Sequence, residues 1–169
     1  MNLIERYLSK PGNYIVEAGG GYGKSTSLKY LAGCLKDRQV NGKKELAVYI
    51  PMAEFNFRNI QAGALLEYLR QFFSMEVTER AILEMIADSA EEYHYLFLLD
   101  GLNEVHNYEV NGQTVMDHIC NDIARLAKYE NVSFIISTRS AELIPANLKK
   151  EFETLVLQPL SNQAVSRYL

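Results

Sequence analysis

The sequence of 169 residues contains no tryptophan, only two cysteines, four prolines, and no apolar run long enough to cross a bilayer. Cys34 and Cys120 fall at core-like positions of predicted helices, without metal-ligand or redox spacing, so we expect buried free thiols. The histidines His94, His106 and His118 are scattered, which disfavours a zinc site. No signal peptide is apparent, and we therefore expect a cytoplasmic protein without a membrane partner.

Basic charge is also scarce. The chain carries 17 Lys and Arg against 21 Asp and Glu, a net charge of −4. Electrostatic binding to nucleic acid draws on clustered basic side chains, and the pairs Lys43-Lys44 and Lys149-Lys150 are isolated, so no direct nucleic-acid partner is expected. The length and the 48% apolar content suit one α/β domain with a full-sized core, and no internal repeat is visible.

What the chain does contain is a glycine-rich segment that fits the phosphate-binding loop, with Ala18 in place of the first glycine. Its candidate nucleotide-binding residues are Gly19, Gly20, Gly21, Tyr22, Gly23, Lys24, Ser25 and Thr26. Glycines let backbone N–H groups wrap a phosphate chain, because they lack a Cβ and tolerate positive φ. Lys24 is placed for the β- and γ-phosphates and Ser25 for Mg²⁺, and the helix dipole adds to both. Tyr22 is either exposed or a lid over the phosphates.

The flanking pattern predicts an α/β fold. We expect strands at residues 13–17, 45–50, 95–100, 132–137 and 154–157. Helices are expected at residues 2–9, directly after the loop, from about 65 to 73, from a cap at Thr78, and over 114–129 and 141–152. The run Tyr95–Leu99 is apolar on both faces, as in a parallel sheet covered by helices on either side.

Three charged residues lie where parallel strands end, at the edge where α/β folds bind ligands. Asp100 can hold Mg²⁺ through water opposite Ser25, or it is a turn residue paired with Gly101. Glu104 can position or deprotonate the attacking water, or it is an exposed loop residue. Arg139 can contact the γ-phosphate, or it is a surface arginine.

Three segments, taken in order, resemble a NACHT-type NTPase of the STAND class, a branch of the AAA+-related P-loop ATPases. They are the phosphate loop, the segment Leu98–Glu104 and the segment Ile135–Arg139. The second is the most telling, because the family has an Asp-Gly-apolar-acid-acid signature with a small residue after the Mg²⁺ carboxylate. Gly101 matches that small residue.

The resemblance implies a three-layer P-loop NTPase with a five-stranded parallel sheet flanked by helices. Numbered along the chain, its strands have the order 5-1-4-3-2. It also implies Lys24, Glu104 and Arg139 as catalytic residues, Ser25 and Asp100 as Mg²⁺ ligands, and ATP or ADP as the nucleotide. Residues 1–160 would form this core, and residues 161–169 would begin a following helical domain.

Family members are switches in which ADP holds a closed monomer and ATP allows oligomerisation and engagement of an effector. We expect a bacterial member of the class, a signalling or defence protein with slow Mg²⁺-dependent ATP hydrolysis, whose further partners are helical, winged-helix and sensor domains of the same protein.

The family pattern is not matched throughout. Asn103 stands where the family usually has a second acid, which removes a charge near the metal. One alternative is therefore a nucleotide-gated scaffold that never hydrolyses ATP. Another is an AAA+-type loader or motor acting on DNA, which the acidic charge disfavours. A small-molecule kinase is disfavoured because no Arg-rich lid segment follows Asp100.

Overall fold

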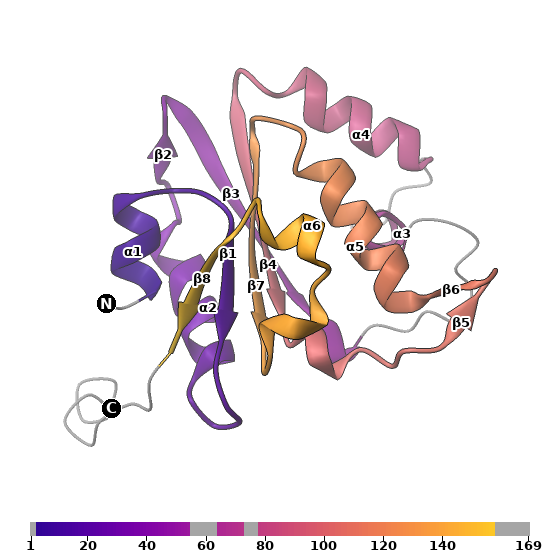
Figure 1. Ribbon diagram of the computed structural model, residues 1–169. Coiled ribbons are helices and arrows are strands. Elements are labelled where there is room, and N and C mark those ends of the chain that lie inside the picture. The colour runs from indigo at the N-terminus through magenta and orange to yellow at the C-terminus, as the bar shows by residue number, and fades with distance from the viewer. Residues whose placement is uncertain (1–2, 55–63, 73–77, 158–169) are drawn as a thin grey trace.

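The computed structural model describes residues 3–54, 64–72 and 78–157, which form a sheet covered by helices on both faces (Figure 1). The sheet has the order β2-β3-β4-β7-β1-β8. Its strands are β1 (Tyr14–Glu17), β2 (Gln39–Val40), β3 (Lys43–Pro51), β4 (Tyr93–Asp100), β7 (Val132–Thr138) and β8 (Glu153–Val156). All neighbouring pairs are parallel except β2 with β3. The predicted order 5-1-4-3-2 is confirmed for the five parallel strands, and β2 is an addition at the β3 edge.

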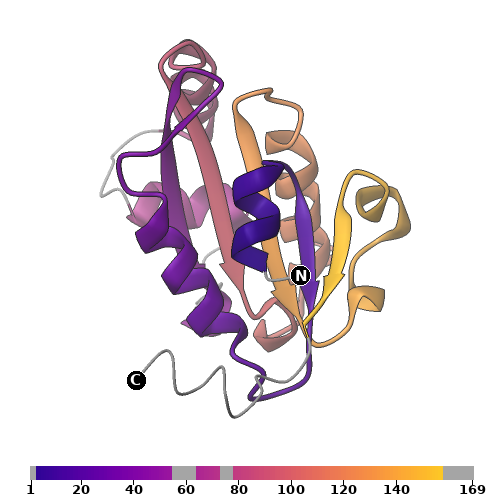
Figure 2. The ribbon, with the colours of Figure 1, turned by 90° about the vertical axis from the view of Figure 1, so that its left-hand side faces the viewer.

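Helices α1 (Leu3–Ser9) and α2 (Lys24–Cys34) cover one face of the sheet (Figure 2). The other face packs against α3 (Ala64–Phe72), α4 (Glu79–Asp88) and α5 (Val115–Leu126). The segment predicted as one helix over 141–152 is instead a 3₁₀ turn, Ala141–Leu143, followed by the short α6 (Ala146–Lys149). Pro145 separates them, since it favours a break before a new helix. Phe73 and residues 161–169 lie outside the described residues.

Two helix starts follow the expected capping chemistry. The Thr78 hydroxyl accepts a hydrogen bond from the Ala81 N–H at 3.3 Å, which confirms the predicted cap of α4. At the start of α5, Thr114 and Asp117 form a capping box, each side chain bonding the other's backbone N–H. Local sequence thus fixes where both helices begin.

Two hairpins turn at Asn-Gly dipeptides and were not predicted. Asn41 and Gly42, with φ of 52° and 81°, join β2 to β3. Asn111 and Gly112, with φ of 53° and 78°, join β5 (Glu109–Val110) to β6 (Gln113–Thr114). Asn-Gly suits the left-handed backbone that a two-residue hairpin requires.

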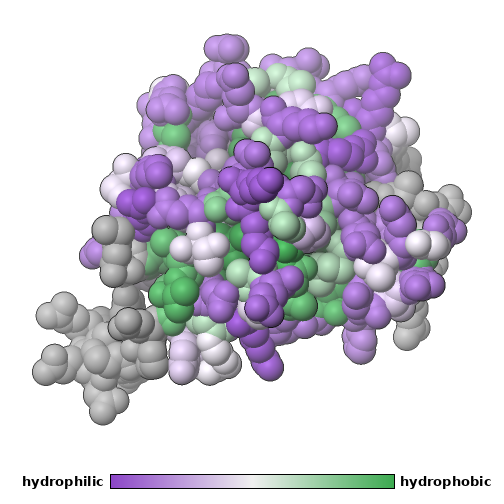
Figure 3. All heavy atoms as spheres, viewed as in Figure 1, coloured by the Kyte–Doolittle hydropathy of each residue, from purple (hydrophilic) through white to green (hydrophobic). Residues whose placement is uncertain are grey.

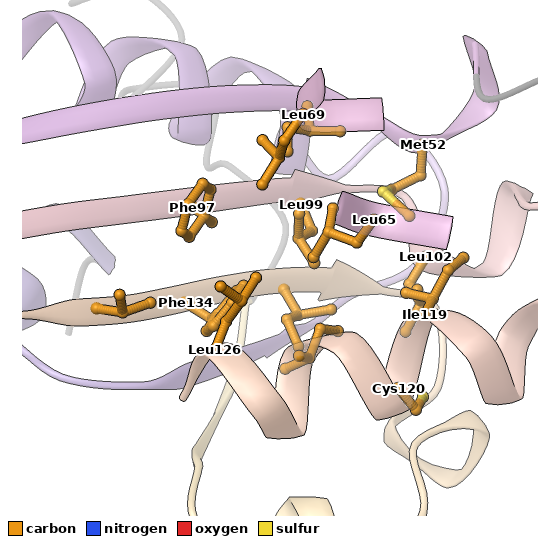
Figure 4. Packing of buried hydrophobic residues seen from close by; sticks show 14 of the residues in the cluster. Met52, Leu65, Leu69, Phe97, Leu99, Leu102, Ile119, Cys120, Leu126 and Phe134 are labelled. Atoms are coloured by element: carbon orange, nitrogen blue, oxygen red, sulfur yellow. The ribbon is translucent and has the colours of Figure 1, made fainter. Parts of the chain in front are cut away.

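The larger of two apolar cores lies between the sheet and helices α3, α4 and α5 (Figure 4). The rings of Phe97 and Phe134 stack there with centroids 5.3 Å apart. Cys120 is buried in this core, and burial raises the pKa of its thiol to about 11. Cys34 is exposed, so the prediction of a buried thiol is wrong for it. It is the last residue of α2, three positions after the buried Leu31.

The second core joins α1 and α2 to the opposite face of the sheet. Tyr7 of α1 is fully buried there, and its hydroxyl donates a hydrogen bond to the carboxylate of Glu45. Arg38 pairs with the same carboxylate at 2.9 Å. At the sheet edge, Arg6 pairs with Glu153 of β8 at 2.7 Å. Helix α1 is therefore bound to strands on both sides of the sheet centre.

The outer surface is mainly hydrophilic on the face shown in Figure 3. Among the described residues, no helix is both long and apolar enough to cross a membrane.

Candidate nucleotide-binding site

The glycine-rich loop connects the end of β1 to the start of α2, as predicted. Gly21 and Gly23 have φ of 78° and 79°, a conformation that other residues adopt only with strain. The ring of Tyr22 lies against Gly19, because a Cβ added at that glycine would sit 3.3 Å from the ring. Tyr22 is 37% exposed, so it packs along its own loop with one side open to solvent.

Lys24, the first residue of α2, turns back over this loop. Its Nζ donates to the carbonyl oxygens of Ala18 at 2.7 Å and Gly19 at 2.8 Å. Burial and then the positive charge of Arg139 lower the pKa of Lys24, against the opposing charges of Asp100 and Glu104. All three predicted partners therefore lie close enough to Lys24 to act on its charge.

Asp100 ends β4 and is only 8% exposed. Its Oδ1 accepts a hydrogen bond from the Ser137 hydroxyl at 2.7 Å, and its Oδ2 accepts one from the Tyr49 hydroxyl at 2.6 Å. Ser137 Oγ in turn accepts from the Gly101 N–H at 2.8 Å. The carboxylate is thus held from both neighbouring strands, β3 and β7.

Directly after Asp100 the chain makes a tight turn that places Glu104. Gly101 has φ of 78°, and the 3₁₀ turn Leu102–Glu104 follows it. A Cβ added at Gly101 would lie 2.9 Å from the carboxyl carbon of Glu104. Glycine is favoured here by its left-handed backbone, and the Glu104 carboxylate lies in the space that a Cβ would take. Glu104 itself is exposed to solvent.

The segment that carries Arg139 is held on both sides. The Arg139 N–H donates to Asn103 Oδ1 at 2.9 Å. On the other side, the Ala18 N–H donates to the Thr138 carbonyl at 3.2 Å, and the Ala141 N–H donates to Glu17 Oε2 at 2.9 Å. Arg139, which is exposed, therefore extends from a backbone tied to both the phosphate loop and the turn of Glu104.

A sequence profile described as the NACHT domain matches residues 14–169. The chain belongs to the NACHT family. The match spans the phosphate loop, the Asp100 strand and the Arg139 strand, which are the segments on which the predicted resemblance rests, and the chain is accordingly a nucleotide-binding P-loop NTPase domain.

Two solved structures of Drosophila ORC with Cdc6 are similar to this NACHT domain in fold. The complex bound to AT-rich DNA contains a chain with a TM-score of 0.58 and 12% identity, over 95% of this chain and 55% of that one. The complex bound to GC-rich DNA contains a chain with a TM-score of 0.53 and 14% identity, over 95% of this chain and 59% of that one. The domain thus spans just over half of those chains. No curated protein matches the chain in a sequence search.

Asp100 of the NACHT domain has the chemistry that a Mg²⁺ site needs. A buried carboxylate is costly unless it is paired or coordinates a metal, and within the described residues no ion pair reaches Asp100. The two hydroxyl donors use two of about four lone-pair positions on the carboxylate. No group of three His, Cys, Asp or Glu gathers in the described part of the chain. One carboxylate with lone pairs left over is the kind of protein ligand that Mg²⁺ takes, beside phosphate oxygens and water.

Sequence reasoning missed Tyr49 and Ser137, the two hydroxyls that hold Asp100. A serine near the carboxyl end of β7 is a signal for the second, since it directly follows the apolar run Phe134–Ile136. Tyr49 gives no such signal, because its role depends on β3 lying beside β4 in a particular register. The link from Asn103 to Arg139 was also missed.

Proposed function

We propose that this NACHT domain is an ATP-binding regulatory switch in a signalling or defence protein. In this proposal, exchange of ADP for ATP permits self-oligomerisation in the cytoplasm, and slow Mg²⁺-dependent hydrolysis resets the domain. The observation that carries it is the convergence of Asp100, Glu104 and Arg139 on Lys24 at the carboxyl end of the parallel strands, where all three act on the Lys24 charge.

The residues of the loop bind the nucleotide. Backbone N–H groups of residues 19–24 supply hydrogen bonds to phosphate oxygens, and Lys24 supplies a cation to the β- and γ-phosphates. Ser25 and Asp100 would hold Mg²⁺, which neutralises the charge that develops on the phosphate oxygens.

Glu104 and Arg139 divide the remaining tasks. Glu104 orients the attacking water and accepts its proton, since its carboxylate is solvent-accessible and lies against Gly101. Arg139 contacts the γ-phosphate and so distinguishes ATP from ADP. Because Asn103 binds the backbone of Arg139, a shift of Arg139 on loss of the γ-phosphate also pulls on the turn that carries Glu104.

A nucleotide-gated scaffold is the second candidate, and Asn103 is the observation that favours it. The missing acid leaves Glu104 as the single carboxylate of its turn. If the scaffold is the correct function, Asn103→Asp creates hydrolysis that the wild type lacks, because aspartate can still accept from the Arg139 N–H while adding a charge.

A single-turnover assay tests the proposal. Excess full-length protein is mixed with labelled ATP and Mg²⁺, with Lys24→Ala as the matched control. We expect slow formation of ADP that Lys24→Ala abolishes, since the variant loses a charge-assisted contact worth about 1.5–3 kcal/mol, or roughly 10- to 100-fold in binding.

The other outcomes select among the alternatives. ATP that is retained but not cleaved favours the scaffold. Turnover that rises when DNA is added favours a loader or motor. If neither wild type nor Lys24→Ala retains nucleotide, the proposed nucleotide switch is wrong.

A further inference from the structure

We infer that Tyr49 is a positioning residue for the Mg²⁺ carboxylate, a role that rests on the function proposed above. Its hydroxyl donates to Asp100 Oδ2 at 2.6 Å, within the range of strong hydrogen bonds to a carboxylate. Tyr49 belongs to β3, a strand that contributes no residue to the predicted site.

The geometry gives this hydrogen bond a directional role. Ser137 bonds Oδ1 from β7 and Tyr49 bonds Oδ2 from β3, so the carboxylate is held at both oxygens and cannot rotate without breaking one bond. Such outer partners of a metal-binding carboxylate fix its orientation and affect metal affinity. Of the two partners, Ser137 also bonds the backbone of Gly101, so a change at Tyr49 tests the carboxylate without removing that backbone contact.

The register of the sheet explains why Tyr49 reaches Asp100. Pro51 of β3 lies opposite Asp100 of β4, and Tyr49 lies opposite Leu98. Side chains two residues apart in a strand share a face, so Tyr49 projects on the face of Pro51 and leans along the strand toward its end. That face is the one covered by α2, the helix that begins with Lys24 and Ser25.

Tyr49 also contacts α2 directly. The Nζ of Lys29 lies over its ring, 5.4 Å from the centroid, and the ring packs against the core shared with α2. One side chain therefore joins the helix of the phosphate loop to the carboxylate at the end of β4. This contact links the elements that carry the two proposed Mg²⁺ ligands, Ser25 on α2 and Asp100 on β4.

The test is a Mg²⁺ titration of nucleotide binding, which does not depend on hydrolysis. A fluorescent non-hydrolysable ATP analogue is bound to full-length protein, first in EDTA and then at rising Mg²⁺. Tyr49→Phe keeps the ring under Lys29 and removes only the hydroxyl. The matched control is Tyr95→Phe, because the Tyr95 hydroxyl also has a hydrogen-bond partner, Ser89 at 2.9 Å, outside the predicted site.

We expect Tyr49→Phe to raise the Mg²⁺ concentration for half-maximal binding roughly tenfold, the lower end of losses seen for outer-shell partners. Binding in EDTA should equal that of the wild type, and Tyr95→Phe should leave the Mg²⁺ midpoint in place. Thermal unfolding of Tyr49→Phe near the wild-type midpoint shows that the variant is folded.

Two results would overturn the inference. An unchanged Mg²⁺ midpoint in Tyr49→Phe removes the role of the hydroxyl while leaving the switch proposal intact. An equal loss of binding with and without Mg²⁺ shows that Tyr49 supports the loop rather than the metal carboxylate. A wild type that binds no analogue under any condition instead ends the proposed function, and this inference with it.

Discussion

Two of the three carboxylates that are buried among the described residues, Glu45 and Asp100, each accept a hydrogen bond from a tyrosine hydroxyl, yet their remaining partners differ. Glu45, near the start of β3, is bonded by Tyr7 and paired with the guanidinium of Arg38 at 2.9 Å. Asp100, at the end of β4, is bonded by Tyr49 and Ser137, and no ion pair joins it to the residues that the structure describes. The first charge is paired within the fold, whereas the second has no ion-pair partner among the described residues, as the proposed Mg²⁺ site requires.

Burial therefore does not separate a structural carboxylate from a candidate metal ligand. What separates them is whether a positively charged side chain of the same domain pairs with the carboxylate. Burial alone would raise the pKa of Glu45, but the neighbouring His94, the Tyr7 hydroxyl and the Arg38 charge outweigh it and leave this pKa lowered. Hydroxyl donors orient a carboxylate without neutralising it. A buried acid that is bonded by hydroxyls, at the carboxyl edge of a parallel sheet, has the features that the proposed metal ligand needs.

Removing the charge of Glu45 should have the largest effect on stability. In Glu45→Gln the partly buried Arg38 loses the negative charge that pairs with it, and we expect about 3 kcal/mol of destabilisation, or roughly a 10 °C fall in the unfolding midpoint. Thermal and urea unfolding measure it. Glu153→Gln is the control, because the Glu153 side chain is 36% exposed, whereas that of Glu45 is fully buried, so the pair of Glu153 with Arg6 should matter much less. Equal losses in the two variants would contradict the assignment of Glu45 as a buried structural acid.

The same residue predicts how stability depends on pH. Since the folded-state pKa of Glu45 lies below its ordinary value of 4.5, its contribution is fully present above about pH 4.5 and is lost as the pH falls toward the folded-state value. The stability gap between wild type and Glu45→Gln should therefore narrow between about pH 5 and about pH 3. Urea unfolding across this range measures the gap, and a gap that stays constant would show that the Glu45 charge does not stabilise the fold.

Asp100→Asn should have the smallest effect on folding. The hydroxyls of Tyr49 and Ser137 can donate to the remaining oxygen or accept from the new amide, and no cation is left without a partner. We expect the free energy of unfolding to change by less than about 1 kcal/mol. If this variant is as destabilised as Glu45→Gln, the distinction drawn between the two acids is wrong.

The sequence was sufficient for the parts of the fold that depend on local pattern. The strand, loop and helix around Lys24 and the apolar strands ending at Asp100 and Thr138 were predicted from residues alone, and the strand order from the family resemblance. The Asn-Gly hairpins were readable but overlooked, because strands as short as Gln39–Val40 carry no periodicity. The break of the last helical segment at Pro145 was overlooked in the same way.

In the candidate site, only residues that belong to a motif with a fixed spacing could be predicted from the sequence. Tyr49, Ser137 and the link from Asn103 to Arg139 depend on which strands lie side by side and in what register, and this is set by packing across the whole sheet. The prediction that Cys34 is buried was wrong for a related reason, since helical spacing near a helix end does not decide which residues the sheet covers. The roles assigned to Lys24, Ser25, Asp100, Glu104 and Arg139 stay predictions.

Helix α1 shows that the folded domain extends beyond the segment that matches the family. The family match begins at Tyr14, yet Leu3, Ile4 and Tyr7 lie in the same core as Leu28 and Leu31 of α2. A polypeptide started at Tyr14 would keep every signature residue and still uncover that apolar surface, along with the carboxylate of Glu45. The family motifs indicate where the proposed site lies. The hydrophobic core beneath that site is completed by a short helix that lies outside the family match.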